Sequence, residues 1–431
     1  MHTQTGPFGS QLHSFDYVSS GIPVVPTEGI GRRRFLTDGI PEISEETAAR
    51  LSRHRLRAGD ILFARRGVQA TGLSAIVTPL QEGWICGTGA LLLRVTGTET
   101  DPEFLSFLLS SDESFEWLRQ HAVGAVMPNL NEGVIRRLPL ALPPLAEQKA
   151  IAVVLGALDD KIELNRRLNA TLEAMARALF QSWFVDFDPV RAKLDGRNPD
   201  GLDKATAALF PAAFQDSPLG PIPRGWKVLP LKDVTSKIGS GATPRGGSAV
   251  YVDEGVALIR SQNVYDHDFR WGGLARLSES SAAELDNVEV RVDDVLFNIT
   301  GDSILRTCVV EPSVLPARVN QHVAIIRAKP PVSSRYVHLY MVQPRIKEFL
   351  LGLNAGATRP AVTKGHLESV LVLHPSPEIL AAFDVATAPM FRQIDTNRIQ
   401  SRTLATLRDT LLPKLLSGEL AVPPALGKVN S

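Results

Sequence analysis

The residues of this chain most suited to chemistry with an anionic partner are its arginines. The first 148 residues contain thirteen arginines and no lysine. A guanidinium group donates two parallel hydrogen bonds to a guanine edge or to a phosphate group, which an ammonium group does not. The candidates in this half are Arg32, Arg33, Arg34, Arg65 and Arg66. Their clustering favours contact with a nucleic acid over the alternative that they are ordinary solvated charges.

The second half of the chain carries a different set of candidate side chains. Gln and Asn suit adenine edges, and several polar residues follow an apolar run or stand in a loop. The candidates in this half are Arg260, Gln262, Asn263, Thr358, Arg359 and Lys364. Contacts to phosphate predict salt-dependent binding, whereas contacts to bases predict a change of specificity on mutation.

Catalytic patterns are weak in this sequence. Glu147-Gln148-Lys149 has the E-x-K spacing of a nuclease metal site, but it falls in the first turn of a predicted helix and has no partner aspartate on a neighbouring strand. We interpret it as helix capping and docking. The sequence lacks the GxxxxGK[ST] phosphate loop, the Asn-Pro-Pro-aromatic signature of amino-methyltransferases, and HExxH or CxxC spacing. We therefore predict no catalytic residue and no metal ligand, which disfavours a single-chain enzyme.

The composition is that of an ordinary globular protein of several domains. The chain has 431 residues, a formal net charge of zero and 44% hydrophobic residues, so any basic surface is local. Two cysteines, Cys86 and Cys308, do not suggest a disulfide framework and favour a reducing compartment. No apolar run reaches membrane-spanning length and the N-terminus lacks a signal-peptide pattern, so we expect a cytoplasmic protein without membrane contact.

A long amphipathic helix is predicted within residues 144–185. Apolar residues recur there at intervals of three and four, after Pro143 and Pro144 and before the aromatic cluster that begins at Trp183. Leu168 and Met175 belong to this apolar pattern. At about 1.5 Å per residue the helix is roughly 60 Å long, so it must pair with another element.

A second long helix is predicted at residues 376–420, where the same pattern returns with every residue number raised by 232. Leu407 continues the pattern in this copy. Two related helices predict an antiparallel intramolecular coiled coil. The predicted seam residues are Leu158, Ile162, Asn165, Leu172, Ile394, Asn397, Leu404 and Leu411. Asn165 and Asn397 correspond by the offset and either meet in the seam to fix its register or face solvent or a docking surface.

The rest of the chain repeats as well. The strand-like run at 59–63 matches 293–297, and the glycine and proline positions at 124–143 match 356–375. The sequence thus predicts two tandem, pseudo-symmetric mixed α/β domains, each followed by a long helix. The expected parts are 1–143, the helix at 144–185, a proline-rich and semi-ordered connection at 186–224, 225–375, the helix at 376–420 and a tail at 421–431. Residues 225–237 have no counterpart in the first copy. Either its domain lacks an edge element or residues before Met1 are missing, and we favour the second alternative, an N-terminally truncated domain.

Residues 142–190 resemble the central region of type I restriction-modification specificity subunits, and residues 6–25, 59–67, 210–226 and 411–420 are similar to other segments of that family. The resemblance covers nearly the whole chain. It implies a non-catalytic subunit whose two target recognition domains each read half of a split site on double-stranded DNA. The paired helices would separate these domains and dock two methyltransferase subunits, onto which the restriction subunits assemble. It also implies that adenosylmethionine, ATP and magnesium are bound by those partners, and that this chain has no cofactor.

The two copies differ in sequence, which predicts an asymmetric rather than palindromic DNA target. The alternative is a coiled-coil scaffold or adaptor without sequence-specific DNA binding. That alternative explains the helices but not two large, diverged globular modules.

Overall fold

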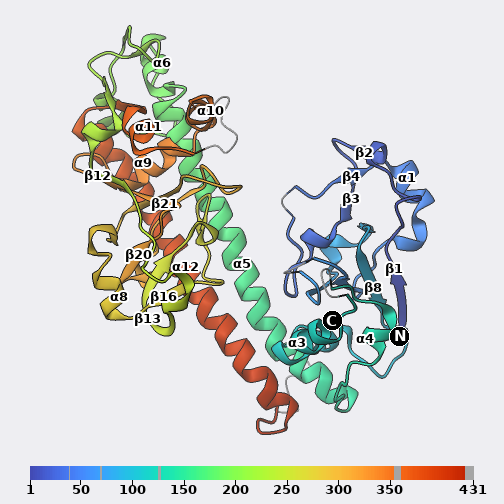
Figure 1. The fold of residues 1–431 in the computed structure, drawn as a ribbon. Helices are drawn as coiled ribbons and strands as arrows, with labels where there is room; N and C mark the ends of the chain where they lie inside the picture. The colour runs from blue at the N-terminus through green and yellow to red at the C-terminus, as the bar shows by residue number, and fades with distance from the viewer. Residues whose placement is uncertain (38, 68–69, 125–127, 354–360, 423–431) are drawn as a thin grey trace. The chain divides into compact units, whose positions relative to one another are not determined.

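The structure is a computed structural model that describes residues 1–37, 39–67, 70–124, 128–353 and 361–422. The chain divides into two compact units. Unit 1 comprises Met1–Asn165 together with the chain from Ile399 onward, and unit 2 comprises Arg166–Arg398. Both long helices are present, α5 at Leu145–Phe184 and α12 at Pro377–Leu416 (Figure 1). Each helix therefore contributes one half to unit 1 and the other half to unit 2.

Two four-stranded sheets form the framework of unit 1. The first has the order β1-β8-β5-β6 and is antiparallel throughout, and the second has the order β2-β4-β3-β7 with one parallel pair, β3 with β7. The strands are β1 (His2–Thr5), β2 (Tyr17–Val18), β3 (Ile22–Val25), β4 (Glu42–Ile43), β5 (Ile61–Ala64), β6 (Ser74–Ile76), β7 (Ile85–Cys86) and β8 (Ala90–Arg94). The shorter helices are α1 (Glu45–Arg50), α2 (Pro102–Leu109), α3 (Asp112–His121) and α4 (Glu132–Arg136).

Unit 2 repeats this framework. Its sheets have the orders β12-β21-β18-β19 and β16-β13-β20-β17, again with one parallel pair, β13 with β20. The strands are β12 (Thr235–Ser240), β13 (Tyr251–Ile259), β16 (Ala275–Leu277), β17 (Glu289–Val290), β18 (Val295–Asn298), β19 (Thr307–Val309), β20 (Ala317–Val319) and β21 (Val323–Ala328). The helices are α8 (Glu279–Ala283), α9 (Ser334–Met341), α10 (Pro344–Gly352) and α11 (Lys364–Ser369). Two further two-stranded ladders pair β11 (Lys227–Pro230) with β22 (Leu371–His374), and β14 (Val264–Tyr265) with β15 (Asp268–Phe269).

The predicted internal repeat and mixed fold class are confirmed element by element. Raising the residue numbers of α2 by 232 gives those of α9, and the same shift places α4 on α11 and α5 on α12. Strand registers agree too, because Gln4 pairs with Leu92 in unit 1 and Ile238 pairs with Ile326 in unit 2, a shift of 234 at both positions.

Two expectations from the sequence were wrong in detail. The connection at 186–224 is folded rather than semi-ordered, with α6 (Asp188–Leu194), α7 (Lys204–Leu209) and the hairpin β9 (Phe214–Gln215)–β10 (Ile222–Pro223). Its apolar residues Val190, Phe210 and Ile222 are buried in the core of unit 2 with the end of α5, and that burial outweighs the breaks imposed by proline. The gap in the first copy is also smaller than expected, because β1 takes the place of β12.

The core of unit 2 gathers around the C-terminal end of α5. Phe180 and Phe184 of this helix pack edge-on or tilted against Tyr336 of α9 and Phe383 of α12, with ring centroids 5.0 to 5.9 Å apart. The aromatic cluster that the sequence places at the end of this helix is therefore core packing. Such edge-to-face pairs add directional contacts to the burial of large rings, and this fixes the helix against the globular part.

Candidate nucleic-acid interface

In unit 2 the end of strand β18 brings together three candidate segments. The buried amide of Asn298, the last residue of β18, donates to the carbonyl oxygens of Ser261 and Val264, 2.9 and 3.3 Å away. One residue further, the backbone N–H of Val362 donates to the Ile299 carbonyl, and Thr300 pairs with Ala361. The loop at 260–263 and the segment that leads to Lys364 therefore both lie at the end of β18. A single DNA-contacting surface formed from both segments requires this arrangement.

Unit 1 builds the same arrangement at the end of β5. The backbone N–H of Leu130 donates to the Arg65 carbonyl at 2.8 Å, the counterpart of the bond from Val362 to Ile299, and Arg66 pairs with Asn129. The side chain of Arg65 donates through Nε to the Asn129 amide oxygen and to the Leu130 carbonyl. Arg65 thus braces the loop, whereas the Arg66 side chain is exposed.

A buried ion pair lies at the opposite end of each of these strands, where β5 and β18 begin. Asp60 accepts two hydrogen bonds from Arg94, at 2.7 and 2.6 Å, and Asp294 accepts two from Arg327, both at 2.7 Å. Both aspartates are buried, and their hydrogen bonds raise the pKa of Arg94 and of Arg327. The paired carboxylate and guanidinium groups tie the start of β5 to β8 and the start of β18 to β21, which fixes the neighbouring strands against each other.

The predicted residues at 260–263 fall into two groups. Arg260 and Gln262 both donate to the Gly273 carbonyl, and the Gln262 side chain is exposed. Asn263 is fully buried, and its amide donates to the carbonyl oxygens of Arg270 and Gly272. Asn263 therefore shapes the loop, and the surface that this loop presents consists of Arg260 and Gln262.

The three consecutive arginines near residue 33 also differ in their surroundings. Arg32 is partly exposed and donates to Asp112 at 2.6 Å, and Arg34 is exposed. The side chain of Arg33 is only 8% exposed, forms ion pairs with Glu103 and Asp159, and lies 3.3 Å from the ring centroid of Phe107. Arg33 therefore has a packing role, and DNA contact by Arg32 and Arg34 stays a prediction.

The last predicted segment is only partly described. Thr358 and Arg359 lie outside the described residues. Lys364 opens α11, has a side chain that is 63% exposed, and forms a loose ion pair with Glu368 at 3.5 Å. Such an exposed pair exchanges readily for a phosphate partner.

The sequence analysis missed an arginine–tyrosine stack beside the loop at 260–263. The guanidinium carbon of Arg270 lies 3.4 Å from the ring centroid of Tyr265, and that of Arg306 lies 4.4 Å from it. Arg270 is tied to the loop through Asn263, and its side chain is 52% exposed. The proximity of Tyr265 and Arg270 in sequence is a signal that could have been used. Nothing in the sequence places Arg306, which lies far along the chain from Tyr265, on the same ring.

The long helices pair antiparallel within each unit. In unit 1 Asp159 of α5 accepts from Arg408 of α12, and one to two turns later Asn165 donates to Gln400 and Ser401. In unit 2 Asn397 of α12 donates to Asn169 of α5 at 2.8 Å. As the residue numbers rise along α5, the residue numbers of their partners in α12 fall. The predicted antiparallel coiled coil is therefore confirmed.

Burial along this helix pair separates the seam from the outer faces. Asn165, Ile394 and Asn397 are buried, and the other predicted seam residues are partly buried: Leu158, Ile162, Leu172, Leu404 and Leu411. Both asparagines face the opposite helix rather than solvent, and their contact with each other stays a prediction. Leu168, Met175 and Leu407 are 39%, 49% and 44% exposed. Their inclusion in the buried apolar pattern was wrong.

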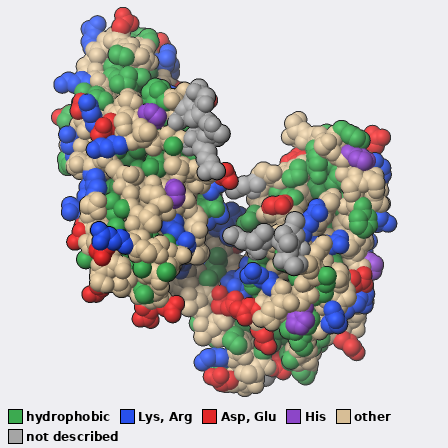
Figure 2. All heavy atoms as spheres, in the orientation of Figure 1, with side chains coloured by type: hydrophobic (Ala, Val, Ile, Leu, Met, Phe, Trp, Pro, Cys, Tyr) green, Lys and Arg blue, Asp and Glu red, His purple; other side chains and the backbone are tan. Residues whose placement is uncertain are grey.

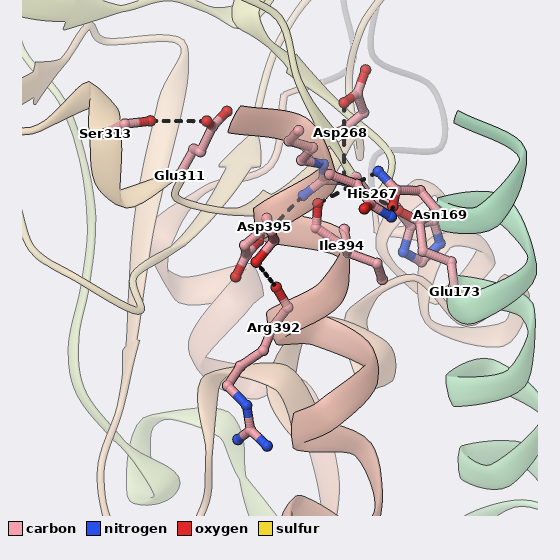
Figure 3. Close-up of polar contacts among 12 residues, drawn as sticks. Asn169, Glu173, His267, Asp268, Glu311, Ser313, Arg392, Ile394 and Asp395 are labelled. Carbon is pink, nitrogen blue, oxygen red and sulfur yellow. Dashed lines mark hydrogen bonds and ion pairs between the residues drawn. The ribbon is translucent and has the colours of Figure 1, made fainter. Parts of the chain in front are cut away.

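In unit 2 a polar cluster joins the helix pair to the turn between β14 and β15. Figure 3 shows Asn169 and Glu173 of α5 and Asp395 of α12 beside His267 of that turn and Asp268, the first residue of β15. Arg398 of α12 donates to Glu173 at 3.1 Å and to the His267 carbonyl. Burial raises the pKa of Glu173, while the Arg398 charge opposes this rise.

Charge on the described surface is mixed. Figure 2 shows Lys and Arg side chains interspersed with Asp and Glu on the face drawn of each unit. Within the described ranges, no group of three or more His, Cys, Asp and Glu has the arrangement of a metal site. None of the helices described is both long enough and apolar enough to cross a membrane.

Comparison with known proteins gives a consistent result. Residues 17–174 match the family described as the type I restriction modification DNA specificity domain. The chain is 27% identical over 408 residues to the type I restriction enzyme HindI specificity subunit of Haemophilus influenzae, covering 85% of this chain and 87% of the relative. It is 26% identical over 327 residues to the MjaIX specificity subunit of Methanocaldococcus jannaschii, covering 74% and 69%. The crystal structure of a type I restriction-modification S subunit from M. genitalium shares the fold, with a TM-score of 0.50, 16% identity, and coverage of 96% of this chain and 93% of that one.

Proposed function

Because the chain belongs to the type I restriction-modification specificity subunits, we propose that units 1 and 2 each read one part of a two-part site on double-stranded DNA. The chain acts by binding and has no catalytic residue of its own. The observation that carries this proposal is the repeated strand end. Unit 1 has Arg65, which braces the loop, and the exposed Arg66 there, whereas unit 2 has Ile299 and Thr300 at the same positions. Like frameworks with unlike side chains support an asymmetric target.

The chemistry of the exposed side chains suits the two roles that DNA contact requires. Arg66, Arg260 and Lys364 supply positive donors for phosphate oxygens or guanine edges, and Gln262 offers the paired donor and acceptor that adenine accepts. The guanidinium groups of Arg270 and Arg306 lie against the ring of Tyr265, and this contact restricts their conformations. Preorganised arginine loses less conformational entropy on binding than a free side chain does.

We propose that the outer faces of α5 and α12 dock two methyltransferase subunits. Exposed apolar side chains stand at positions of the two helices that the internal repeat matches, Val153 with Val385 and Met175 with Leu407. Such exposed apolar positions are typical of protein interfaces. The duplication provides two like surfaces, which supports two copies of one partner, with the restriction subunits assembling through them. Adenosylmethionine, ATP and magnesium are then bound by the partners, and the complex works in the cytoplasm.

Selection from a random DNA pool tests the proposed function directly. The full chain is mixed with its methyltransferase subunits and a pool of random duplexes, and bound DNA is recovered and sequenced. We expect enrichment of two short, different sequence elements separated by an unspecified spacer. Binding of the partners without any enrichment favours the scaffold alternative and contradicts the proposal.

A further inference from the structure

The connection at 320–322, which joins β20 to β21, also lies at the end of β18 in unit 2. The backbone N–H of Ile299, the residue that directly follows β18, donates to the His322 carbonyl at 3.0 Å. Asn320 donates its N–H to the carbonyl of Ile259, the last residue of β13 before the loop at 260–263, also at 3.0 Å. This connection is therefore part of the same surface as the candidate DNA-contacting segments of unit 2.

Within the connection the side-chain amide of Gln321 is held at both its oxygen and its nitrogen. Gln321 Oε1 accepts a hydrogen bond from the Thr243 hydroxyl, and Gln321 Nε2 lies 3.1 Å from His322 Nε2. An amide nitrogen donates and does not accept, so His322 Nε2 is the acceptor and the ring proton is on Nδ1. That proton is donated to the Thr300 hydroxyl at 2.6 Å. These bonds fix the plane of the Gln321 amide.

Gln321 is nevertheless exposed. An amide oxygen has two acceptor positions and an amide nitrogen has two donor positions, so one of each remains after the bonds to Thr243 and His322. An adjacent donor and acceptor match the N7 and N6 groups that adenine presents in the major groove. Because its orientation is already fixed, Gln321 loses less side-chain entropy on binding than a mobile glutamine does.

This arrangement belongs to unit 2. Gly89 takes the place of His322 in unit 1, because its carbonyl accepts from the Arg65 N–H at 3.0 Å as the His322 carbonyl accepts from the residue after β18. Glycine has no side chain that could orient a neighbouring amide, and Arg66 Nε lies 2.9 Å from the position that a Cβ on Gly89 would take. One place in the repeated framework thus carries a guanidinium group in unit 1 and an oriented amide in unit 2.

We propose that Gln321 reads an adenine in the part of the DNA site that unit 2 recognises, and that Thr243 and His322 are positioning residues that set the plane of its amide. This inference rests on the proposed function, within which it assigns one base contact. Gln321 donates to adenine N7 and accepts from the N6 amino group, while its second donor and second acceptor keep their bonds to the protein.

Replacing Gln321 with glutamate separates base reading from bracing of the connection. A carboxylate still accepts from Thr243, and it accepts from His322 once the ring proton is on Nε2, so the fold should survive. A carboxylate cannot donate to adenine N7, whereas it accepts from the amino group of cytosine. Random duplexes are selected with the complex of the chain and its methyltransferase subunits. We expect Gln321→Glu to lower the preference for one adenine, in one part of the motif only, by about tenfold or more.

Variants of the positioning residues test how the amide is held. Thr243→Val and His322→Ala should each lower the preference for that same adenine by about three- to tenfold, because the amide is then free to turn. The slope of log affinity against log salt should stay unchanged, since no phosphate contact is removed. Gln120→Glu is the matched control, because Gln120 is an exposed glutamine of α3 in unit 1 and should leave every position of the motif unchanged. Thermal melts verify that each variant is folded.

The selection with the natural chain distinguishes the failure of this inference from the failure of the proposed function. A two-part motif that folded Gln321→Glu leaves unchanged overturns the reading of adenine by Gln321 and leaves the proposed function standing. A loss of preference spread over every position of one part assigns Gln321 to bracing alone, which also overturns the inference. The absence of a two-part motif for the natural chain overturns the proposed function, and this inference with it.

Discussion

The guanidinium of Arg33 donates through Nε to the carboxylate of Asp159, 2.7 Å away, across 126 residues of sequence. Arg33 has a left-handed backbone conformation with φ of 61°, and Asp159 of α5 also accepts from Arg408 of α12. The residue at the same place in unit 2, His267, has φ of 63° and receives a bond from Arg398 of α12 at its carbonyl. Each unit thus uses a turn in the left-handed conformation to fasten its globular part to the helix pair.

Replacing Arg33 with alanine is expected to destabilise unit 1 by about 3 kcal/mol, because it leaves the Glu103 carboxylate and part of the Asp159 carboxylate without a partner near the buried Phe107 ring. Urea denaturation followed by circular dichroism measures the free energy of unfolding. Arg32→Ala is the control, since the pair of Arg32 with Asp112 is exposed and should be worth less than about 1 kcal/mol. Equal losses in the two variants would contradict the packing role of Arg33.

The hydrogen bond between the side-chain amides of Asn397 and Asn169 should give a measurable coupling free energy in a double-mutant cycle. Asn169→Ala, Asn397→Ala and the double variant are compared by urea denaturation. Because Asn397 is buried and its amide donates at 2.8 Å, we expect a coupling free energy of about 1 kcal/mol. Strictly additive losses would mean that this bond does not help to hold the helix register.

Unit 2 should lose stability as the pH falls below 6.5. His338 Nε2 and His267 Nδ1 lie 2.9 Å apart, and burial followed by nearby positive charge lowers the pKa of His267 to about 4 and that of His338 well below its ordinary value. Both rings are neutral in the fold and gain protons on unfolding, so their contribution is complete above pH 6.5 and declines towards pH 4.

The size of this pH effect follows from the shift of His267. At pH 5 the free energy of unfolding should be about 1 to 2 kcal/mol lower than at pH 7 from this residue. Carboxyl groups elsewhere also change the free energy of unfolding over this pH range. The natural chain is therefore compared with the double variant His267→Asn/His338→Gln, which lacks the contribution of these two histidines to the pH dependence. An identical pH slope in the double variant would contradict the assignment.

Arg66 should contribute a phosphate contact. We expect Arg66→Ala to weaken DNA binding by the assembled complex and to reduce the slope of log affinity against log salt by about 1. Binding is measured by titration at several salt concentrations. Arg50→Ala is the control, because Arg50 is 52% exposed and is paired with Asp16 of the same unit. A salt slope that Arg66→Ala leaves intact would remove Arg66 from the interface.

The matched exposed apolar residues on the two helices should each contribute to one of two like docking surfaces. Met175→Asp or Leu407→Asp should each reduce the number of bound methyltransferase subunits from two to one, because each change spoils one of two like surfaces. Native mass spectrometry of the assembled complex reads the stoichiometry. Leu194→Asp in α6, at a residue 58% exposed, is the control. Retention of two subunits by both helix variants would contradict this docking surface.

The sequence was most informative where a pattern recurs over many residues. The long helices, their antiparallel pairing and the repeated sheets follow from apolar spacing and from one offset. Which apolar helix residues face inward did not follow, because Leu168 and Met175 satisfy the same spacing as buried residues and only the position of the facing helix decides between them. Apolar residues spaced three and four apart form a stripe along the helix, and this stripe is wider than the surface that a single facing helix buries.

The candidate site was predictable in its segments but not in its individual contacts. The loops at 65–66 and 260–263 do lie at strand ends. Residue type alone, however, did not distinguish the exposed Arg66 from the buried Arg33, because the partners of Arg33 lie 70 and 126 residues further along the chain. Asn263 carries a local signal, since asparagine often bonds the backbone of its own turn, and that reading would have placed it inside the loop.

The most direct test of the account is the methylation motif of cells that carry the intact system with Gln262→Arg in place of the natural chain. Genome-wide methylome mapping gives the recognised sequence for the natural chain and for the variant. If the units read separate parts of the site, the natural motif has two parts, and the variant changes or weakens the preference in one part only while the other part and the spacer stay the same. A change in both parts, or a single contiguous motif, would contradict the account.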